Sequence, residues 1–405
     1  MRAGLTLSTG WWSRFLKKRR PDIVKAVLNS LRENIAPWYK NLRGWRTNRR
    51  IVVIESDDWG SIRMPSREVY KKCLNAGYRV DQIAYEKFDS LASEEDLELL
   101  FDLLKSFSDK NGKHPVITAN VLTANPDFEK IKENDFCEYY YESVEDTFKR
   151  YPKHRRCFDL WNQGFNERIF YPQSHGREHL NVYMFMNALR SRNEDALFAF
   201  EHQMPGIMNC NSMEGNFFVE SLKYFNREDK NKKLKIILEG LEQFEELFGY
   251  KSRSFIPPNY FWSPDFNESM SNSGVLFYQG NRLMKEPSIG EEKNIIHSHY
   301  LGERNEHNQL YLIRNAMFEP SLEEDKNDEL VDLCLQQIEA AFFLKKPAII
   351  CSHRLNFIGY LNEMNRDNNL KMLKNLLVKI LRKWPNVEFM TSDTLGNLIH
   401  ENDRT

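Results

Sequence analysis

The sequence lacks the features that mark several large classes of protein. Its six cysteines are scattered without a C-x-x-C pair, so they suggest no disulfide framework and fit reduced thiols in the cytoplasm. No apolar run approaches the roughly 20 residues that cross a bilayer, and the N-terminus has no apolar signal-peptide core. There is no internal repeat and no low-complexity tract. We therefore expect a cytoplasmic, globular protein.

The net charge is close to zero only for the chain as a whole. The 405 residues have a net charge of −1, yet residues 1–50 contain 13 Lys and Arg against two acidic residues, with tryptophans interleaved. We interpret this range as a solvated N-terminal segment, and the alternative is a segment that contacts an anionic membrane surface. No nucleic-acid recognition motif accompanies the charge, so we expect no nucleic-acid partner.

After residue 50, short β-branched runs alternate with segments of helical spacing. The runs are 51–55, 115–121, 168–173, 252–257, 275–280, 310–315, 347–352 and 387–391, and the clearest helical segments are 93–107, 232–249, 328–344 and 369–384. This alternation predicts parallel β/α construction, in which seven or eight units close a barrel with the active site at the C-terminal strand ends. Residues 122–167 are less regular and predict an insertion over the barrel mouth, within one domain that spans 51–400.

Two motifs follow predicted strands and together suggest a metal site. Asp57 and Asp58 come directly after the run 51–55, where a cation would relieve the repulsion between neighbouring carboxylates; an Asp turn or helix cap is the alternative. His175 and His179 follow the run 168–173, and on one helical turn both imidazoles would point the same way. Two His and one Asp form a facial set for a divalent ion.

Three further polar sites contain titratable His or Glu residues. His353 ends the run 347–352 and could protonate a leaving group, or could be a core or capping histidine. His297 and His299 form an H-x-H, an alternative ligand pair without an accompanying carboxylate. Strand alternation suggests that Glu55 points away from the site.

The order of these motifs resembles the polysaccharide deacetylases of the NodB-homology group, carbohydrate esterase family 4. That family's pattern is an apolar strand with T-F-D-D-G, then H-S/T-x-x-H, then R-x-P-Y/P, and a late strand ending in L-x-H; the match runs from about 51 to 400. The resemblance implies an irregular (β/α)7 barrel. It also implies that Asp57 is the catalytic base, that Asp58, His175 and His179 are metal ligands, usually for zinc, and that His353 is the general acid.

The sequence departs from the family pattern at three positions. Trp59 displaces the glycine that follows the acidic pair, and Gly176 stands where the family has Ser or Thr. Ile256 stands where the family has the Arg that braces the base, and Arg253 is the nearest candidate to replace it. The sequence is thus expected to belong to a divergent branch that keeps the residues of the metal site but lacks the arginine that braces the base.

Several residues near these motifs are candidates for substrate contact: Trp59, Arg253, Pro258, Asn259, Tyr260 and Arg354. The aromatic residues 59 and 260–262 could form a sugar-stacking surface or belong to the core. Arg354 could bind an acidic sugar or brace its loop.

These features predict a metal-dependent hydrolase with a divalent ion, zinc being expected, that removes an acetyl group from an N- or O-acetylated sugar or polysaccharide precursor. Two alternatives stay open. One is a different hydrolysis on the same scaffold, of a glycosidic or non-peptide C–N bond. The other is a catalytically inactive carbohydrate-binding protein, which the intact set of five polar residues disfavours.

Overall fold

The computed structural model describes residues 38–207, 218–291, 293–323 and 327–402. Most of the basic N-terminal segment, and with it the main basis for the predicted membrane contact, lies outside the described residues. None of the helices in the described ranges is long and apolar enough to cross a membrane.

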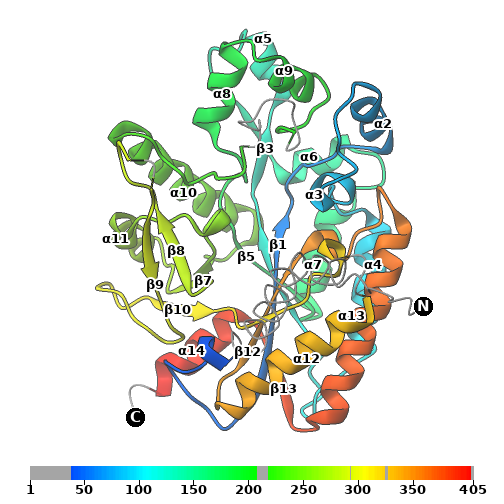
Figure 1. The fold of residues 1–405 in the computed structure, drawn as a ribbon, viewed down its shortest axis with the longest axis vertical. Helices are drawn as coiled ribbons and strands as arrows, with labels where there is room; N and C mark the ends of the chain where they lie inside the picture. The colour runs from blue at the N-terminus through cyan, green and yellow to red at the C-terminus, as the bar shows by residue number, and fades with distance from the viewer. Residues whose placement is uncertain (1–37, 208–217, 292, 324–326, 403–405) are drawn as a thin grey trace, which may run out of the picture.

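A curved parallel sheet forms the centre of the molecule (Figure 1). Its strands are β1 (Arg50–Trp59), β2 (Ile117–Val121), β5 (Phe170–Ser174), β6 (Ser254–Phe255), β7 (Phe277–Gly280), β10 (Leu310–Ile313), β11 (Ala316–Met317), β12 (Ala348–His353) and β13 (Val387–Met390). Eight of them follow the order β10-β7-β6-β5-β2-β1-β12-β11, β13 pairs with β1 beside this path, and all these pairs are parallel. Each predicted run of β-branched residues is therefore a strand.

The two ends of this strand order meet in one bent segment of the chain. Only Arg314 and Asn315 separate β10, which pairs with β7, from β11, which pairs with β12. The order contains eight strands, and β10 and β11 at its two ends belong to this one segment. When the segment is counted once, seven strands surround the barrel within the described ranges. The prediction of an irregular (β/α)7 barrel is confirmed.

Strand β1 holds the central position in the barrel. It pairs with β12 on one side, and on the other side with β13 along its first half and β2 along its second. From residue 51 to 59 every residue of β1 is buried, because sheet partners and helices cover it on all sides. The strand that carries the acidic pair is therefore held by three pairing strands and is shielded from solvent.

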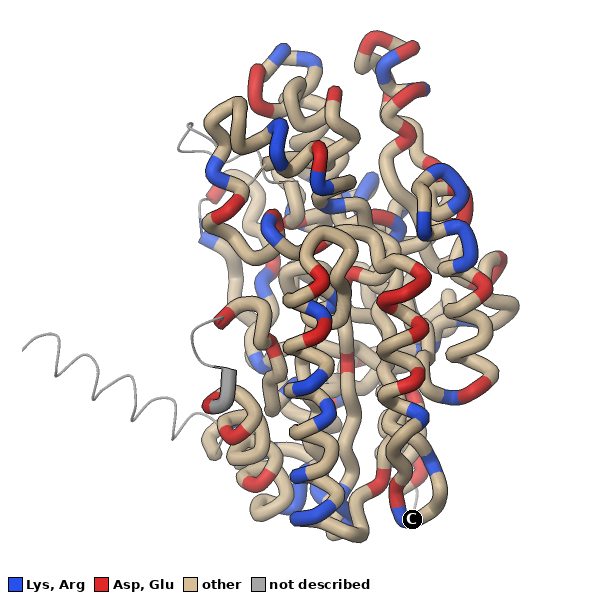
Figure 2. The backbone as a smooth tube through the Cα atoms, turned by 90° about the vertical axis from the view of Figure 1, so that its right-hand side faces the viewer, with Lys and Arg blue, Asp and Glu red and all other residues tan. Residues whose placement is uncertain are grey.

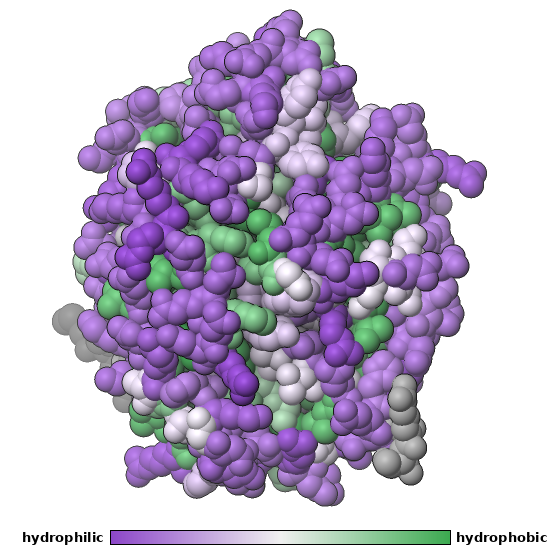
Figure 3. Space-filling view, turned by 180° about the vertical axis from the view of Figure 1, so that it is seen from behind, coloured by the Kyte–Doolittle hydropathy of each residue, from purple (hydrophilic) through white to green (hydrophobic). Residues whose placement is uncertain are grey.

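The outer layer consists of helices α4 (Glu94–Lys105), α7 (Cys157–Asn166), α10 (Arg227–Phe248), α12 (Asn327–Phe343), α13 (Glu363–Lys383) and α14 (Ser392–Asn402). Helix α4 begins at a capping box formed by Ser93 and Asp96, and α10 ends at Gly249, whose φ of +73° suits a glycine. Buried side chains of α4, α7, α12 and α13 form a large apolar core with one set of strand residues, and α14 packs with another set in a smaller cluster. Charged residues of both signs are spread along the outer elements (Figure 2), and the back of the molecule is largely hydrophilic with small hydrophobic areas (Figure 3).

Additional elements extend the barrel at the end where the strands finish (Figure 1). They are α2 (Arg67–Asn75), α3 (Ala84–Lys87), the hairpin of β3 (Ala124–Pro126) and β4 (Tyr141–Ser143), α5 (Phe128–Glu133), α6 (Val144–Arg150), α8 (Val182–Arg190) and α9 (Glu194–Glu201). The range 122–167 contains the hairpin with α5 and α6, and also α7, which packs against β5 in the barrel layer. A second hairpin, β8 (Leu283–Glu286) and β9 (Ile295–Ser298), lies beside α11 (Asn267–Asn272) (Figure 1).

The described end of the N-terminal segment packs against the barrel. The backbone N–H of Trp45 donates to Leu301 O at 2.8 Å, and the Lys346 ammonium donates to Trp45 O at 2.8 Å. Asn315, in the bend between β10 and β11, donates from its side chain to Asn41 Oδ1 at 2.8 Å. These contacts hold residues 41–45 against the barrel, beside the bend between β10 and β11.

Candidate metal centre and active-site cavity

A cavity of about 210 Å³ opens at the C-terminal ends of β1, β5 and β12. Its walls are formed by Asp57, Asp58, Arg63, Tyr85, His175, His179, Val219, Ile256, Pro257, Asn259, Tyr260 and His353. The structure therefore gathers into one cavity the five polar residues that the three sequence motifs supply.

The backbone of β1 explains how two consecutive carboxylates reach the same cavity. In a regular strand Asp57 and Asp58 would point to opposite faces. The pairing of β1 with β2 is irregular between Ser56 and Trp59, and Asp58 has a φ of +71°, a left-handed conformation that Asp tolerates better than most residues. This local bulge turns Asp58 toward the cavity beside Asp57.

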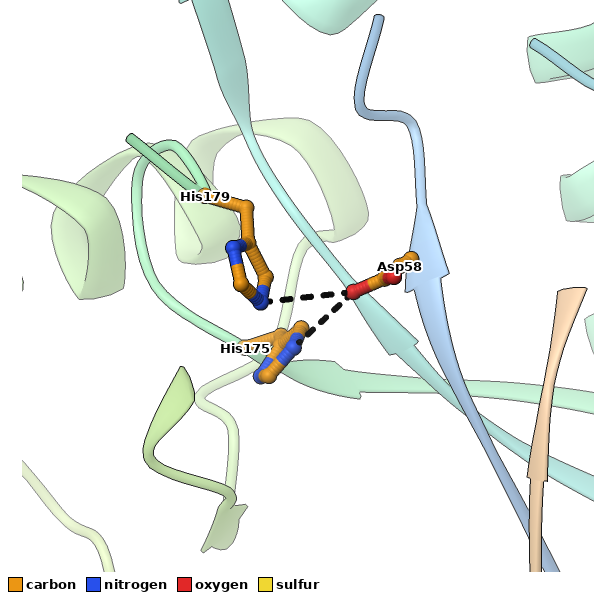
Figure 4. Close-up of side chains that lie close together, drawn as sticks. All are labelled: Asp58, His175 and His179. Atoms are coloured by element: carbon orange, nitrogen blue, oxygen red, sulfur yellow. Dashed lines mark ion pairs between the residues drawn. The ribbon is translucent and has the colours of Figure 1, made fainter. Parts of the chain in front are cut away.

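Asp58, His175 and His179 form a buried cluster of potential metal ligands (Figure 4). Asp58 Oδ1 lies 3.4 Å from His175 Nε2 and 3.5 Å from His179 Nε2. The three ligand atoms lie within 4.8 Å of one another, close enough to bind one ion.

The hydrogen bonds around this cluster fit a bound cation. His175 Nδ1 lies 2.8 Å from Ile256 O, and because a carbonyl oxygen only accepts, Nδ1 donates this bond and leaves Nε2 as the nitrogen available to a metal ion. Nε2 faces Asp58 Oδ1, a buried acceptor that receives no hydrogen bond from any described residue. Burial lowers the pKa of His179 to about 3, so the His179 imidazole is neutral at neutral pH. Two imidazole nitrogens and a carboxylate oxygen that face one another are a set of ligand atoms that suits a divalent ion.

The segment that carries both histidines corrects one prediction. It is an irregular loop rather than a helical turn, since β5 ends at Ser174 and α8 begins only at Val182. Gly176 has a φ of +108°, a conformation that L side chains rarely adopt, and this accounts for glycine where the family has Ser or Thr.

Asp57 is held by an arginine that the sequence analysis did not identify. Arg314 Nη2 donates to Asp57 Oδ1 at 2.6 Å and Nη1 donates to Oδ2 at 2.7 Å, a bidentate pair. Asn120 Nδ2 also donates to Oδ1 at 2.7 Å. Burial opposes ionisation, but Arg314 prevails and lowers the pKa of Asp57 to about 2. Asp57 is therefore ionised at neutral pH.

The contacts of Arg314 show that the predictions for Arg253 and Glu55 are wrong. Arg253 precedes β6 and packs over the Phe277 ring at 5.7 Å, lining a separate cavity with Leu276 and His307, so it does not brace the base. Glu55 shares the inward face of β1 with Asp57, because residues two apart in a strand point the same way. Its Oε2 accepts from Arg314 Nε at 2.6 Å.

His353 is held by a second residue that the sequence analysis missed. Its Nδ1 lies 2.6 Å from Glu319 Oε1, and its Nε2 lies 3.8 Å from Asp57 Oδ2. Burial would lower the pKa of His353, but the Glu319 carboxylate outweighs it and raises this pKa to about 9. At neutral pH His353 is protonated, opposite in state to Asp57.

Both missed residues follow strands. Arg314 directly follows β10, and Glu319 lies two residues after β11. The rule that polar residues at C-terminal strand ends form the site would have placed Arg314 among the candidates.

The candidate substrate residues fall into two groups. Asn259 and Tyr260 line the cavity, with consecutive φ values of +53° and +59° that turn the chain toward it, and Arg314 Nη1 lies 3.4 Å from the Tyr260 hydroxyl. Pro258 is buried behind them, while Pro257 forms the wall.

The predicted contacts of Trp59 and Arg354 with substrate are corrected. Trp59 is 0% exposed, donates from its indole N–H to Ser56 Oγ and packs edge-on against Phe170, so it offers no surface to a sugar. Arg354 is also 0% exposed, and its Nε donates to Asp89 Oδ1 at 2.9 Å, which braces the loop. Phe261 and Trp262 belong to the core as well.

The alternative ligand pair lies away from the cavity. His297 is on β9 and its Nε2 lies 2.9 Å from Glu286 Oε2, while His299 stacks on Tyr311 with ring centroids 3.8 Å apart. A carboxylate does accompany the pair, contrary to the sequence analysis, but these residues form no metal-sized cluster among the described residues.

No protein-family model and no curated protein matches the sequence. Among solved structures, the chain is similar to a candidate polysaccharide deacetylase from Mycobacterium smegmatis, with 9% identity, a TM-score of 0.44, and coverage of 89% of this chain and 94% of that chain. It is similar to Puue allantoinase with 10% identity, a TM-score of 0.44, and coverage of 88% and 92%. For a 4-alpha-glucanotransferase from Thermococcus litoralis, identity is 11% and the TM-score 0.40, and the match covers 85% of this chain but 40% of that chain.

Other similar structures include further deacetylases and a CE4 family pseudoenzyme from Bacillus anthracis. Polysaccharide deacetylases are the family that the sequence motifs resemble. Because identities and TM-scores are low throughout, the function proposed below is inferred from the residues of the cavity.

Proposed function

We propose that this protein is a metal-dependent hydrolase that removes an acetyl group from an acetylated sugar. One observation carries the proposal: a buried set of two imidazoles and a carboxylate shares a small cavity with an ionised carboxylate and a protonated imidazole. Two titratable groups whose environments push their pKa values apart are the arrangement that acid–base catalysis needs.

The ligand set favours zinc. Two imidazole nitrogens and one carboxylate oxygen leave open positions for water and substrate, as in catalytic zinc sites. An ion held by Asp58, His175 and His179 would supply Lewis acidity, lowering the pKa of a water and polarising the acetyl carbonyl.

The protein's own residues would then divide the proton transfers. Asp57 takes the proton from the attacking water, most readily through Oδ2, because Oδ1 already accepts from both Arg314 and Asn120. His353, whose Nε2 faces Asp57 Oδ2 across 3.8 Å, gives its proton to the leaving nitrogen or oxygen of the sugar. Glu319 keeps His353 protonated until that step.

The size of the cavity supports a small reacting group. At about 210 Å³ it is smaller than the roughly 300–1,000 Å³ of typical small-molecule sites. An acetyl group with part of one sugar ring fits such a space, and the remainder of a larger glycan would lie outside it.

Metal content and product analysis test the proposal. Purified protein is expected to bind one equivalent of Zn²⁺, and a His175→Ala/His179→Ala variant none, whereas a His297→Ala/His299→Ala control keeps it. Equal metal in all three would refute the metal site. Acetate release from acetylated sugars supports deacetylation, whereas new reducing ends or ammonia would indicate the other hydrolyses, and glycan binding without turnover a pseudoenzyme.

We also propose that the N-terminal segment contacts an anionic membrane surface. The segment is basic, and it presents the exposed Trp38 next to the exposed Phe343 of α12, with ring centroids 5.3 Å apart. The Thr47 N–H donates to Lys345 O, which holds the end of the segment close to Phe343. Cosedimentation with anionic but not neutral vesicles is expected, weakened by Trp38→Ala/Phe343→Ala. An Ile295→Ala/Ile296→Ala control removes exposed apolar side chains from β9 and should bind like the wild type; equal loss would contradict the proposal.

A further inference from the structure

The loop between the two histidine ligands, residues 175–179, has no regular secondary structure to hold it. Metal sites depend on residues outside the coordination sphere that fix the orientation of each ligand. Because no backbone ladder of a helix is available here, side-chain contacts must supply that support.

Arg177 lies in the middle of this loop and is 4% exposed. Its Nε and Nη2 donate to the two carboxylate oxygens of Glu178 at 2.6 and 2.8 Å, and its Nη1 forms an ion pair with Glu239 of α10. Its guanidinium carbon lies 4.1 Å from the centre of the Tyr141 ring in β4. The Arg177 carbonyl accepts from Ala124 N–H of β3 at 2.8 Å. One residue thus joins the loop to α10 and to the β3–β4 hairpin.

Helix α10 approaches the same loop closely at Gly240. A Cβ atom added there would lie 2.6 Å from Arg177 N and 3.0 Å from Arg177 Cα. Both are backbone atoms, so no flexible side chain can move aside to make room. Only glycine allows the helix and the histidine loop to pack at this distance.

From these contacts we infer that Arg177 is a positioning residue of the metal centre, acting with Gly240 and the β3–β4 hairpin. The inference rests on the proposed metal site and deepens it. It assigns the inserted hairpin to metal affinity rather than to substrate covering, because Tyr141 and Ala124 contact the loop that spaces the ligands.

Metal affinity of matched variants tests the inference. Arg177→Lys keeps the charge but loses the fork that engages Glu178, and Gly240→Ala displaces the loop backbone. Each is expected to weaken Zn²⁺ binding, measured by chelator competition, by roughly 10- to 100-fold. The Co²⁺-loaded variants should also show a changed visible spectrum, which reports ligand geometry and would not respond to a general loss of stability.

The control is Arg190→Lys. Arg190 supports the same inserted region by donating to Phe136 O at 3.1 Å and Cys137 O at 2.7 Å, and neither contact involves the histidine loop. This variant should bind Zn²⁺ with wild-type affinity. If Arg177→Lys does not fold, Tyr141→Leu, at a partly exposed residue, should still weaken binding severalfold.

The outcomes separate the inference from the proposed function. Wild-type protein that binds no Zn²⁺ would refute the metal site itself. Wild-type protein that binds Zn²⁺, with unchanged affinity and Co²⁺ spectrum in the Gly240→Ala and Tyr141→Leu variants, would overturn the positioning role alone. Equal weakening by Arg190→Lys would also overturn it.

Discussion

The two halves of the cavity differ in how completely the protein satisfies their carboxylates and imidazoles. On the acid–base side, Asp57 is clamped by Arg314 and Asn120, and His353 is held by Glu319. On the metal side, Asp58 Oδ1 accepts no hydrogen bond within the described ranges. Buried polar atoms without partners are costly, so natural proteins leave them where a ligand completes the site.

The acid–base side is complete in the protein alone. The acid–base side needs no additional group to set its charges, because neighbouring side chains fix opposite protonation states. The metal side leaves a buried carboxylate oxygen, Asp58 Oδ1, that the proposed cation would complete. We therefore expect substitutions on the first side to alter turnover and pH dependence while metal stays bound.

The largest effect expected on the acid–base side comes from Asp57→Asn. It removes the base but leaves Asp58, His175 and His179 in place, so kcat should fall by roughly 10²- to 10⁴-fold with Zn²⁺ content unchanged. Steady-state kinetics and metal analysis on the same preparation provide the check. Retained activity would show that another group takes the proton.

Arg314→Lys should have the next largest effect. Lysine cannot reproduce the bidentate pair with Asp57, and a misplaced base lowers kcat/KM by up to about 10²-fold. Arg253→Lys is the matched control and should leave kcat/KM unchanged, because Arg253 lines a different cavity. Loss of activity in the control but not in Arg314→Lys would reverse the assignment.

Glu319→Gln should move the alkaline limb of the pH–rate profile. His353 must be protonated to act as the acid, so activity is lost as pH rises through its pKa of about 9. Removing the Glu319 charge lowers that pKa, and the limb should shift to lower pH with little change at acidic pH. A profile identical to the wild type would exclude His353 as the titrating acid.

Trp59→Phe should have the smallest effect on catalysis. Trp59 is 0% exposed and contacts Ser56 and Phe170 without lining the cavity, so kcat/KM should stay within about twofold of the wild type. Unfolding free energy should fall by roughly 1–3 kcal/mol, because the bond to Ser56 and core volume are lost. A selective rise in KM for the sugar, without loss of stability, would restore the stacking role.

Local patterns predicted most of the fold. Buried parallel strands appear as continuous apolar runs, so β1, β2, β5, β7, β10, β12 and β13 were recognisable, and helical spacing indicated α4, α10, α12 and α13. The five polar residues of the cavity were predicted for the same reason, since each follows such a run or lies at its end.

The braces of the acid–base side could not be predicted from local patterns. Arg314 is 257 residues from Asp57, and the two meet only because β10 and β11 bring the ends of the strand order together. The family pattern places the bracing arginine in an R-x-P triplet, where this chain has Ile256. Here the arginine is Arg314, in the bend between β10 and β11. The geometry of the histidine loop was missed because spacing alone cannot distinguish a helical turn from an irregular loop.

The central place of β1 also has a consequence for synthesis. The strand with both aspartates is the first of the barrel to be made, but it pairs with β12 and β13, which are the last. About 330 residues separate Asp57 from Met390, so at cellular rates of translation roughly 15–70 s pass before every neighbour of β1 exists. During that time β1 lacks β12, β13 or both, which are two of the three strands that pair with it. The site is therefore assembled last, and its formation marks the completion of the fold.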